Sequence, residues 1–461
     1  MSTTSKPNTI KSINPATNEL LMEFDIISPE QLKTVISNAD TAFQSWRATS
    51  FAERARILNR AADLMDERKE ELGRLATLEM GKKLAESIGE VTLSANFYRY
   101  YAEHGAAFLA DKKIETALGA SWIAYEPLGT LLSIQPWNFP YYQVIRVSAP
   151  QLMAGNTMIL KHASNVPQCA QAMEDILRDA GLPAGVFTNI FLPGSQAERL
   201  LEDPRIKGVM LTGSERAGAS IAATAGRNIK KATLELGGSD ALVILDDADV
   251  EAASNAAVYG RMFNAGQACV SPKRIIVQKA IAEQVISRAL AILDTFKPGD
   301  PMDAATSIAP LSSEGAVTEI LAQVASAVEQ GGRLLRGGHR LDRPGAYMEP
   351  TVLIDVKKGS SAYEEEIFGP VLTFFTVKTD EEAIHLANDT NFGLGGSVFG
   401  SEKRAVAIAK RIDSGMVYVN TLTGASPERP FGGTKNSGFG REQSEAGILE
   451  FVNAKNIVVA S

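Results

Sequence analysis

One of the two cysteines in the chain, Cys269, has the surroundings that a covalent nucleophile needs. It lies in residues 264–270 (NAGQACV), whose small side chains leave room for a substrate to approach the sulfur. A thiolate in such a place can act as a nucleophile. The alternative is a packing cysteine in a tight loop. Cys169 fits that packing role, because it lies on a predicted helix and buried cysteines are common.

Two polar residues earlier in the chain have the types that would support a nucleophile. Glu235 ends an apolar run, residues 232–234, and precedes two glycines. Burial at such a strand end raises the pKa of a carboxyl group, which can then act as a general base near neutral pH. Asn138 lies between two prolines in residues 136–140 (PWNFP), and a rigidly held amide suits an oxyanion hole. The ordinary alternatives are a solvated loop glutamate and a turn-forming asparagine.

Two further residues are candidates for binding a phosphate or a ribose. Ser214 follows the predicted strand 206–211 and begins a helix, where backbone N–H groups can hold an anion. The run from Gly213 to Gly218 has neither the spacing nor the lysine of a P-loop, so it is weak evidence alone. Lys161 ends the predicted strand 157–160, although an ordinary surface lysine is the alternative.

The elements that must position these residues follow from the hydrophobic pattern. Residues 29–109 show the 3.6-residue period of helices. From residue 129 strands and helices alternate, which predicts a parallel sheet with ligands at the carboxyl ends of its strands. The predicted strands are 129–134, 157–160, 187–192 and 206–211, and the predicted helices 141–153, 168–179, 196–201 and 217–225.

A second α/β region is predicted from about residue 236. Its expected strands are 241–245 and 274–278, its expected helices are 280–294, 383–388 and 402–414, and residues 331–345 are expected to form an exposed loop. A short strand is expected at 121–125. The apolar end, residues 457–460, is predicted to be a strand that another subunit covers, because an exposed apolar edge promotes aggregation.

Length and composition limit the class of protein. The 461 residues predict two or three domains, and a net charge of −8 without a basic block argues against nucleic-acid binding. Two cysteines and four histidines, scattered along the chain, predict neither a disulfide framework nor a metal site. The polar N-terminus and the lack of a long apolar run predict a cytoplasmic protein that does not enter membranes.

These motifs, in this order, resemble the aldehyde dehydrogenase superfamily over nearly the whole chain. Residues 136–140 resemble its oxyanion-hole motif, and residues 234–238 (LELGG) its general-base motif. Residues 266–269 (GQAC) resemble its nucleophile motif, with Cys269 34 residues after Glu235. Residues 365–370 (EEIFGP) look like the segment that holds the nicotinamide ribose. The C-terminal signature is matched by residues 430–433 (PFGG) and 437–442 (SGFGRE).

The resemblance implies an α/β protein with the aldehyde dehydrogenase fold. A Rossmann-like cofactor domain would comprise residues 1–117 and 129–237, and an α/β catalytic domain residues 238–437. A β bridging, or oligomerisation, arm would comprise residues 118–128 and 438–461. That arm would pair with a partner subunit in a homodimer or homotetramer.

The resemblance also implies oxidation of a small-molecule aldehyde to a carboxylate, with NAD or NADP as cofactor. Cys269 would form a thioester, Asn138 and the Cys269 N–H would stabilise the oxyanion, and Glu235 would activate water. Val147 stands where some members carry a relay lysine, and Glu442 is a candidate secondary carboxylate. The implied cofactor contacts are Ile134, Trp137, Lys161, Ser164, Gly194, Gly213, Ser214, Glu366 and Phe368.

Two positions bear on cofactor and substrate choice. Many NAD-preferring members have glutamate where this chain has the uncharged Ser164, so we expect NADP to be accepted, alongside NAD. Arg146 resembles the residue of succinate-semialdehyde dehydrogenases that binds the distal carboxylate. Ser426 stands where that group often has a carboxylate-binding serine, whereas a second arginine found in some members is Phe263 here. Phe139 and Gln143 complete the predicted substrate contacts.

Alternatives to this interpretation stay open. Arg146 can instead form a structural ion pair. The substrate can be another small aldehyde, such as glutarate semialdehyde or a neutral aliphatic one. A CoA-acylating enzyme would not need Glu235. A non-catalytic structural protein on the same fold would not need Cys269, Glu235 and Asn138 together.

Overall fold

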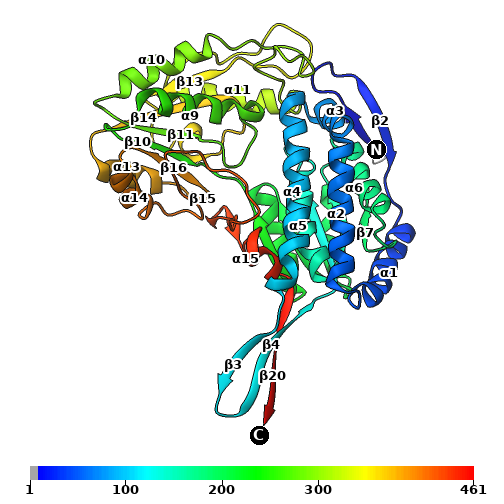
Figure 1. Ribbon diagram of the computed structural model, residues 1–461. Helices are drawn as coiled ribbons and strands as arrows, with labels where there is room; N and C mark the ends of the chain where they lie inside the picture. Colours follow the sequence, from blue (N-terminus) through cyan, green and yellow to red (C-terminus); the bar gives the residue numbers. More distant parts are fainter. Residues whose placement is uncertain (1–8, 461) are drawn as a thin grey trace.

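The computed structural model describes residues 9–460, and helices dominate its N-terminal part (Figure 1). Ser28 begins the first helix with a capping box to Gln31, and Ser50 caps the second through its side chain. The third ends at Gly81, which adopts a φ of 87°. The predicted helical region is confirmed as α1 (Pro29–Trp46), α2 (Phe51–Glu67), α3 (Lys69–Met80) and α4 (Leu84–Phe108).

A six-stranded sheet follows these helices, with strand order β19-β9-β8-β5-β6-β7. Its strands are β5 (Thr130–Gln135), β6 (Thr157–His162), β7 (Phe187–Asn189), β8 (Ile206–Thr212), β9 (Lys231–Glu235) and β19 (Gly438–Phe439). All neighbours are parallel except β19, so the predicted parallel sheet is confirmed. The segments between its strands contain α5 (Tyr142–Ala154), α6 (Pro167–Asp179), α7 (Gly194–Ala197), the 3-10 helix η1 (Glu198–Glu202) and α8 (Glu215–Arg227).

Helices cover both faces of this sheet. Leu131 and Met158 pack with α5 and α6, which α2 to α4 cover in turn. Leu132 and Ile159 point to the other face and pack with α1 and α8. The period-2 alternation of the strands therefore buries both faces, as a parallel sheet requires.

A seven-stranded sheet forms the second α/β region, with order β12-β13-β14-β11-β10-β16-β17. Its strands are β10 (Ala241–Ile244), β11 (Arg274–Gln278), β12 (Arg333–Arg336), β13 (Thr351–Ile354), β14 (Val371–Val377), β16 (Gly396–Phe399) and β17 (Tyr418–Val419). One face packs on α9 (Val250–Met262) and α10 (Ala282–Leu293). The other packs on α11 (Glu314–Glu329), α13 (Asp380–Asn388) and α14 (Glu402–Ala409).

Two predictions for this region were wrong in detail. Residues 331–345 contain the edge strand β12, which pairs antiparallel with β13, so the segment is not only a loop. The helix expected over residues 402–414 ends at Ala409, because the apolar residue Ile412 packs in the core from a turn rather than from a further helical turn.

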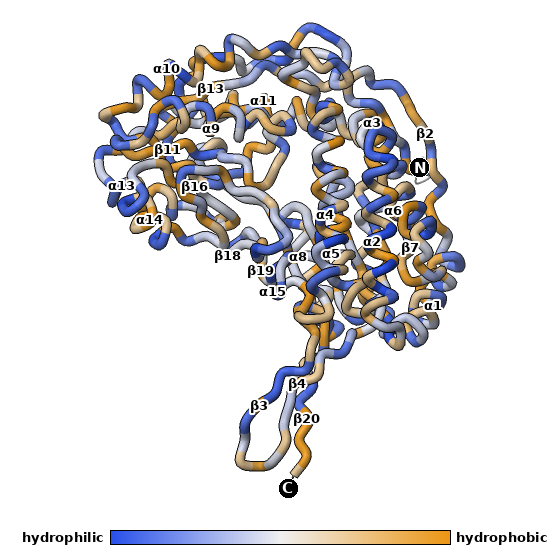
Figure 2. Tube along the Cα trace, in the orientation of Figure 1, coloured by the Kyte–Doolittle hydropathy of each residue, from blue (hydrophilic) through white to orange (hydrophobic). Residues whose placement is uncertain are grey.

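A three-stranded antiparallel sheet projects from the body of the molecule (Figure 1). It consists of β3 (Lys112–Thr116), β4 (Gly119–Pro127) and β20 (Val452–Ala460), and β4 lies between the other two. The sequence predicted only a short part of β4 and the end of β20. Figure 2 shows the apolar end of β20 at the tip of this sheet, where Val458 and Val459 are 42% and 55% exposed.

Shorter elements complete the chain and join its parts. β19 pairs with β9, so that Gly438 lies opposite Glu235 at the junction of the two large sheets. No helix within residues 9–460 is long and apolar enough to span a bilayer. The remaining elements are β1 (Thr9–Ile13), β2 (Leu20–Asp25), the 3-10 helix η2 (Phe263–Gly266), α12 (Ser361–Glu364), β15 (Phe392–Gly393), β18 (Thr434–Lys435) and α15 (Ser444–Leu449).

Candidate active site

A cavity of about 480 Å³ lies between the two large sheets, and half of the predicted site residues line it. These are Trp137, Asn138, Gln143, Gly213, Ser214, Cys269, Glu366 and Phe368. Pro136, Leu236, Gly237 and Glu365 also line it, and they lie within the motifs recognised in the sequence. The sequence missed the rest of the wall, because it comes from strands, helices and loops that are far apart in the chain. These residues are Thr212, Glu215, Glu319, Gln323, Glu364, Asn391 and Phe392.

The loop after α9 presents Cys269 to the cavity. Asn264 and Ala265 have φ values of 50° and 51°, and Gly266 has a φ of 77°, so the chain turns sharply out of the helix. A β-carbon at Gly266 would lie 2.2 Å from the backbone oxygen of Gly369, so only glycine fits there. This sharp turn brings Cys269 to the cavity, where the small residues beside it were predicted to leave room for a substrate.

The electrostatic surroundings of the thiol act in opposite directions. Burial raises the pKa of Cys269 to about 12, while the positive charges of Arg146 and Lys273 lower it. The sulfur is only half-buried, whereas Cys169 is fully buried in α6 beside Glu79. The packing role predicted for Cys169 agrees with this position.

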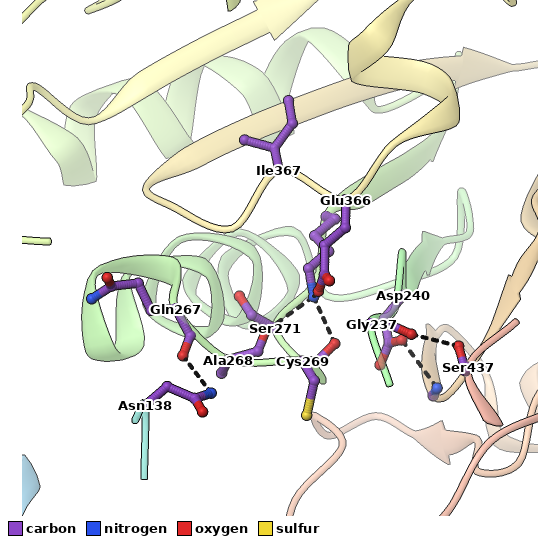
Figure 3. A network of polar contacts seen from close by, with 12 residues as sticks. Asn138, Gly237, Asp240, Gln267, Ala268, Cys269, Ser271, Glu366, Ile367 and Ser437 are labelled. Carbon is purple, nitrogen blue, oxygen red and sulfur yellow. Dashed lines mark hydrogen bonds and ion pairs between the residues drawn. The ribbon is translucent and has the colours of Figure 1, made fainter. Parts of the chain in front are cut away.

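Asn138 is held directly against the Cys269 loop, as Figure 3 shows. Its side-chain Nδ2 donates a hydrogen bond to the Gln267 carbonyl oxygen at 3.0 Å. In return, the Asn264 side chain donates to the Asn138 carbonyl oxygen at 2.9 Å. These reciprocal bonds join the segment before α5 to the loop after α9, so the amide and the sulfur lie on the same side of the loop.

Glu235 ends β9 and is buried, with no hydrogen-bond partner for either carboxyl oxygen among residues 9–460. Burial, and then the neighbouring charge of Glu442, hold its pKa well above the ordinary range. A β-carbon at Gly432 would lie 2.7 Å from its Oε1, so a larger residue there would press on the carboxylate. Glu235 lies behind the cavity wall rather than in it.

Lys273 and Asp240 are polar residues of this region that the sequence analysis missed. The Lys273 ammonium lies 2.9 Å from Glu366 Oε1 and donates to the Cys269 carbonyl oxygen at 2.6 Å. Asp240 accepts a hydrogen bond from the Gly395 N–H, and burial raises its pKa to about 7. The sequence signal for Lys273 was its place in the charged pair Lys273-Arg274, directly before the apolar run 275–277 of β11.

Arg146 does not line the cavity and is fully buried in an ion pair with Glu442. Its Nη2 also donates to the Thr212 hydroxyl at 3.0 Å, and its guanidinium lies over the Phe431 ring at 4.8 Å. This ion pair is the alternative that the sequence left open. The predicted contact of Arg146 with a substrate carboxylate stays a prediction.

The other predicted residues do not line the cavity. The buried Lys161 side chain makes no hydrogen bond or ion pair within the described chain, and a β-carbon on Gly194 would lie 3.7 Å from its Nζ. Ser164 is exposed, and Ile134 lies near the end of β5. Phe139 stacks on Phe263 with ring centroids 5.8 Å apart. The Ser426 hydroxyl donates to Glu428.

Comparison with known proteins defines the class of this protein. A model of the aldehyde dehydrogenase family matches residues 2–457, and the chain belongs to that family. The fold and the resemblance predicted from the motifs are therefore confirmed.

Several similar proteins are named succinate-semialdehyde dehydrogenases. The chain is 46% identical to a succinate-semialdehyde dehydrogenase [NADP(+)] of Deinococcus radiodurans, over 96% of this chain and 93% of the relative. It is 45% identical to a probable enzyme of the same name from Synechocystis, over 98% and 100% of the two chains. The structure of succinic semialdehyde dehydrogenase from Streptococcus pyogenes in complex with NADP+ superposes with a TM-score of 0.96 at 42% identity, over 98% and 100% of the chains.

The different burial of the two cysteines predicts selective alkylation. Iodoacetamide should modify Cys269 in the native protein and leave Cys169 unmodified, because only Cys269 borders the cavity. The rate of Cys269 modification should rise with pH, because the thiolate is the reactive form and burial raises the pKa of the thiol. Peptide mass spectrometry measures the result, and unfolded protein, in which both cysteines react, is the control. Modification of Cys169 at a comparable rate in the native protein would contradict the described burial.

Proposed function

We propose that this protein oxidises succinate semialdehyde to succinate with NADP, and also NAD, as cofactor. The observation that carries the proposal is the reciprocal pair of hydrogen bonds that places the Asn138 amide beside the Cys269 loop in one cavity. The names of the relatives, succinate-semialdehyde dehydrogenases [NADP(+)], supply the substrate and the cofactor. The alternative substrates are glutarate semialdehyde and neutral aliphatic aldehydes.

The first half of the reaction uses Cys269 and Asn138. The Cys269 thiolate adds to the aldehyde carbon, a C–S bond forms, and the carbonyl electron pair moves to oxygen. The Asn138 amide and the Cys269 N–H donate to that oxyanion. When bound, a nicotinamide would supply the hydride acceptor that the adduct needs, and Cys269 would hold the resulting acyl group as a thioester.

Glu235 completes the cycle as the general base. It takes a proton from the water that attacks the thioester carbon, the C–S bond breaks, and the carboxylate product leaves. The raised pKa of Glu235 suits this role, because the buried group binds a proton more readily than a solvated glutamate does.

The residues present fit a dinucleotide phosphate. Ser214 caps the N-terminus of α8 at the carboxyl end of β8, where N–H groups can bind a pyrophosphate. Lys161 is a buried ammonium without a protein partner in the described residues, which suits a phosphate or a ribose hydroxyl. Phe368 and Trp137 meet edge to face at 5.9 Å beside Glu366, a group that can accept hydrogen bonds from a ribose.

The assembly and the domains are part of the proposal. The projecting sheet of β3, β4 and β20 would be the arm that pairs with a partner subunit in a homodimer or homotetramer. Its exposed apolar residues Val458 and Val459 support this role. Strands β5 to β9 would belong to the cofactor domain, residues 1–117 and 129–237, and the seven-stranded sheet to the catalytic domain, residues 238–437. β3 lies within residues 1–117 but pairs with β4 of the arm.

The first test is the nucleophile. Cys269→Ala should abolish aldehyde oxidation while NADP still binds, because only the sulfur of the site is removed. The absorbance of reduced cofactor measures turnover, and calorimetry measures binding. Cys169→Ala is the matched control and should keep its turnover, since Cys169 lies in the core of α6. Turnover by the Cys269 variant would refute the assignment.

The second test concerns the cofactor. Comparison of kcat/KM should show efficient use of NADP, and Ser164→Glu should lower kcat/KM for NADP at least ~10-fold more than for NAD, because a carboxylate repels the 2′-phosphate. Ser164→Ala is the neutral control. A preference of the unmodified enzyme for NAD above ~100-fold would contradict the prediction.

The third test separates the two roles of Arg146. If the guanidinium binds the substrate, Arg146→Ala should raise KM for succinate semialdehyde far more than for butanal. The guanidinium has five N–H donors, so it can serve Glu442 and a substrate carboxylate together. Glu442→Gln, which breaks the ion pair but keeps the arginine, is the control. Equal effects on both aldehydes would assign Arg146 to the ion pair alone.

A further inference from the structure

Lys273 is a buried lysine for which the proposed reaction has no use, yet its ammonium contacts the nucleophile loop at two points. Its side chain is 4% exposed. Nζ donates to the carbonyl oxygen of Cys269 at 2.6 Å and to that of Ala268 at 3.0 Å. Glu366 lies 2.9 Å away and balances the charge, so the ammonium has two carbonyl acceptors and a counter-ion.

The contact with Ala268 bears on the Cys269 N–H, because both groups belong to one peptide unit. No peptide bond among the described residues is cis. In a trans peptide the C=O and the N–H point in opposite directions. The Ser271 N–H also donates to the Ala268 oxygen, at 3.1 Å, so two donors hold the carbonyl end of this unit.

The N–H end of the same peptide unit, which belongs to Cys269, has no acceptor in the part of the chain that the structure describes. Within residues 9–460 the Cys269 N–H donates to no group. It points away from Lys273, since Lys273 lies at the carbonyl end. Figure 3 shows Glu366, the counter-ion of Lys273, on one side of the loop, and the Asn138 amide and the Cys269 sulfur on the other. The next peptide unit toward the N-terminus is held by Asn138 itself, through the Gln267 oxygen.

We propose that Lys273 is a positioning residue for the oxyanion hole, which orients and polarises the Cys269 N–H through the Ala268 carbonyl. The inference rests on the proposed function, since it concerns the step in which the sulfur adds to a carbonyl carbon. As the C–S bond forms, the carbonyl electron pair becomes an alkoxide that accepts from this N–H. A cation on the far end of the peptide withdraws electron density from the amide and strengthens it as a donor.

Two other roles for Lys273 must be separated from this one. As a nearby cation it can simply favour the thiolate form of Cys269. It can also serve only as the counter-ion of Glu366. An effect on the thiolate would change a reaction that forms no oxyanion as much as one that does. A role only as counter-ion would be seen in a variant of Glu366.

The experiment compares two reactions of the same sulfur. The burst of nitrophenolate from p-nitrophenyl acetate reports acylation through an oxyanion without hydride transfer, whereas alkylation by iodoacetamide forms no oxyanion. Both depend equally on the thiolate fraction, so their ratio at one pH reports the oxyanion step. In Lys273→Met this ratio should fall ~10-fold or more, less than the ~10²–10³ that loss of a whole donor causes.

Further variants complete the test. Lys273→Arg keeps the charge and should recover most of the ratio, and Lys273→Gln replaces the methionine variant if that one does not fold. Lys230→Met is the matched control. Lys230 follows the C-terminus of α8 and donates to the Asp203 carbonyl oxygen, not to the Cys269 loop, so its loss should leave the ratio unchanged. An unchanged ratio in Lys273→Met, or an equal loss in Glu366→Gln, would overturn the proposal. A burst that survives in Cys269→Ala would instead refute the proposed nucleophile.

Discussion

The reciprocal hydrogen bonds between Asn138 and the Cys269 loop are the constraint on which the site depends. They connect the segment after β5 of the six-stranded sheet with the loop before β11 of the seven-stranded sheet. Two bonds in opposite directions fix distance and orientation together, because neither partner can slide without losing one of them. The cavity exists where these two sheets meet, and the amide and the sulfur share it only because this junction is closed.

Burial at this junction determines the electrostatics. Removing water raises the pKa values of both Cys269 and Glu235, which favours their neutral forms. The charges that remain are paired, Arg146 with Glu442 and Lys273 with Glu366, because an unpaired charge in such surroundings is costly. Within residues 9–460 the carboxylate of Glu235 has no hydrogen-bond partner, so it can take up a proton during turnover without breaking a bond.

The position of Arg146 illustrates how one residue can serve structure and recognition together. Its ion pair with Glu442 and its bond to Thr212 join α5, β8 and the C-terminal segment. A guanidinium held in this way loses little conformational entropy on binding a further carboxylate. The similarity to succinate-semialdehyde dehydrogenases [NADP(+)] supports that second role, whereas the burial of Arg146 supports the first.

Local patterns in the chain were enough to predict the alternation of strands and helices, the parallel sheet and the motifs around Asn138, Glu235 and Cys269, because hydrophobic period and turn chemistry are local properties. The sequence alone could not place Arg146 against Glu442, 296 residues later, or show that Lys273 holds the nucleophile loop. It also missed β1, β2, β3 and the part of the cavity wall that α11, α12 and residues 391–392 form. These features arise where distant segments meet, and only the tertiary structure decides which side chains find partners and which remain free to react.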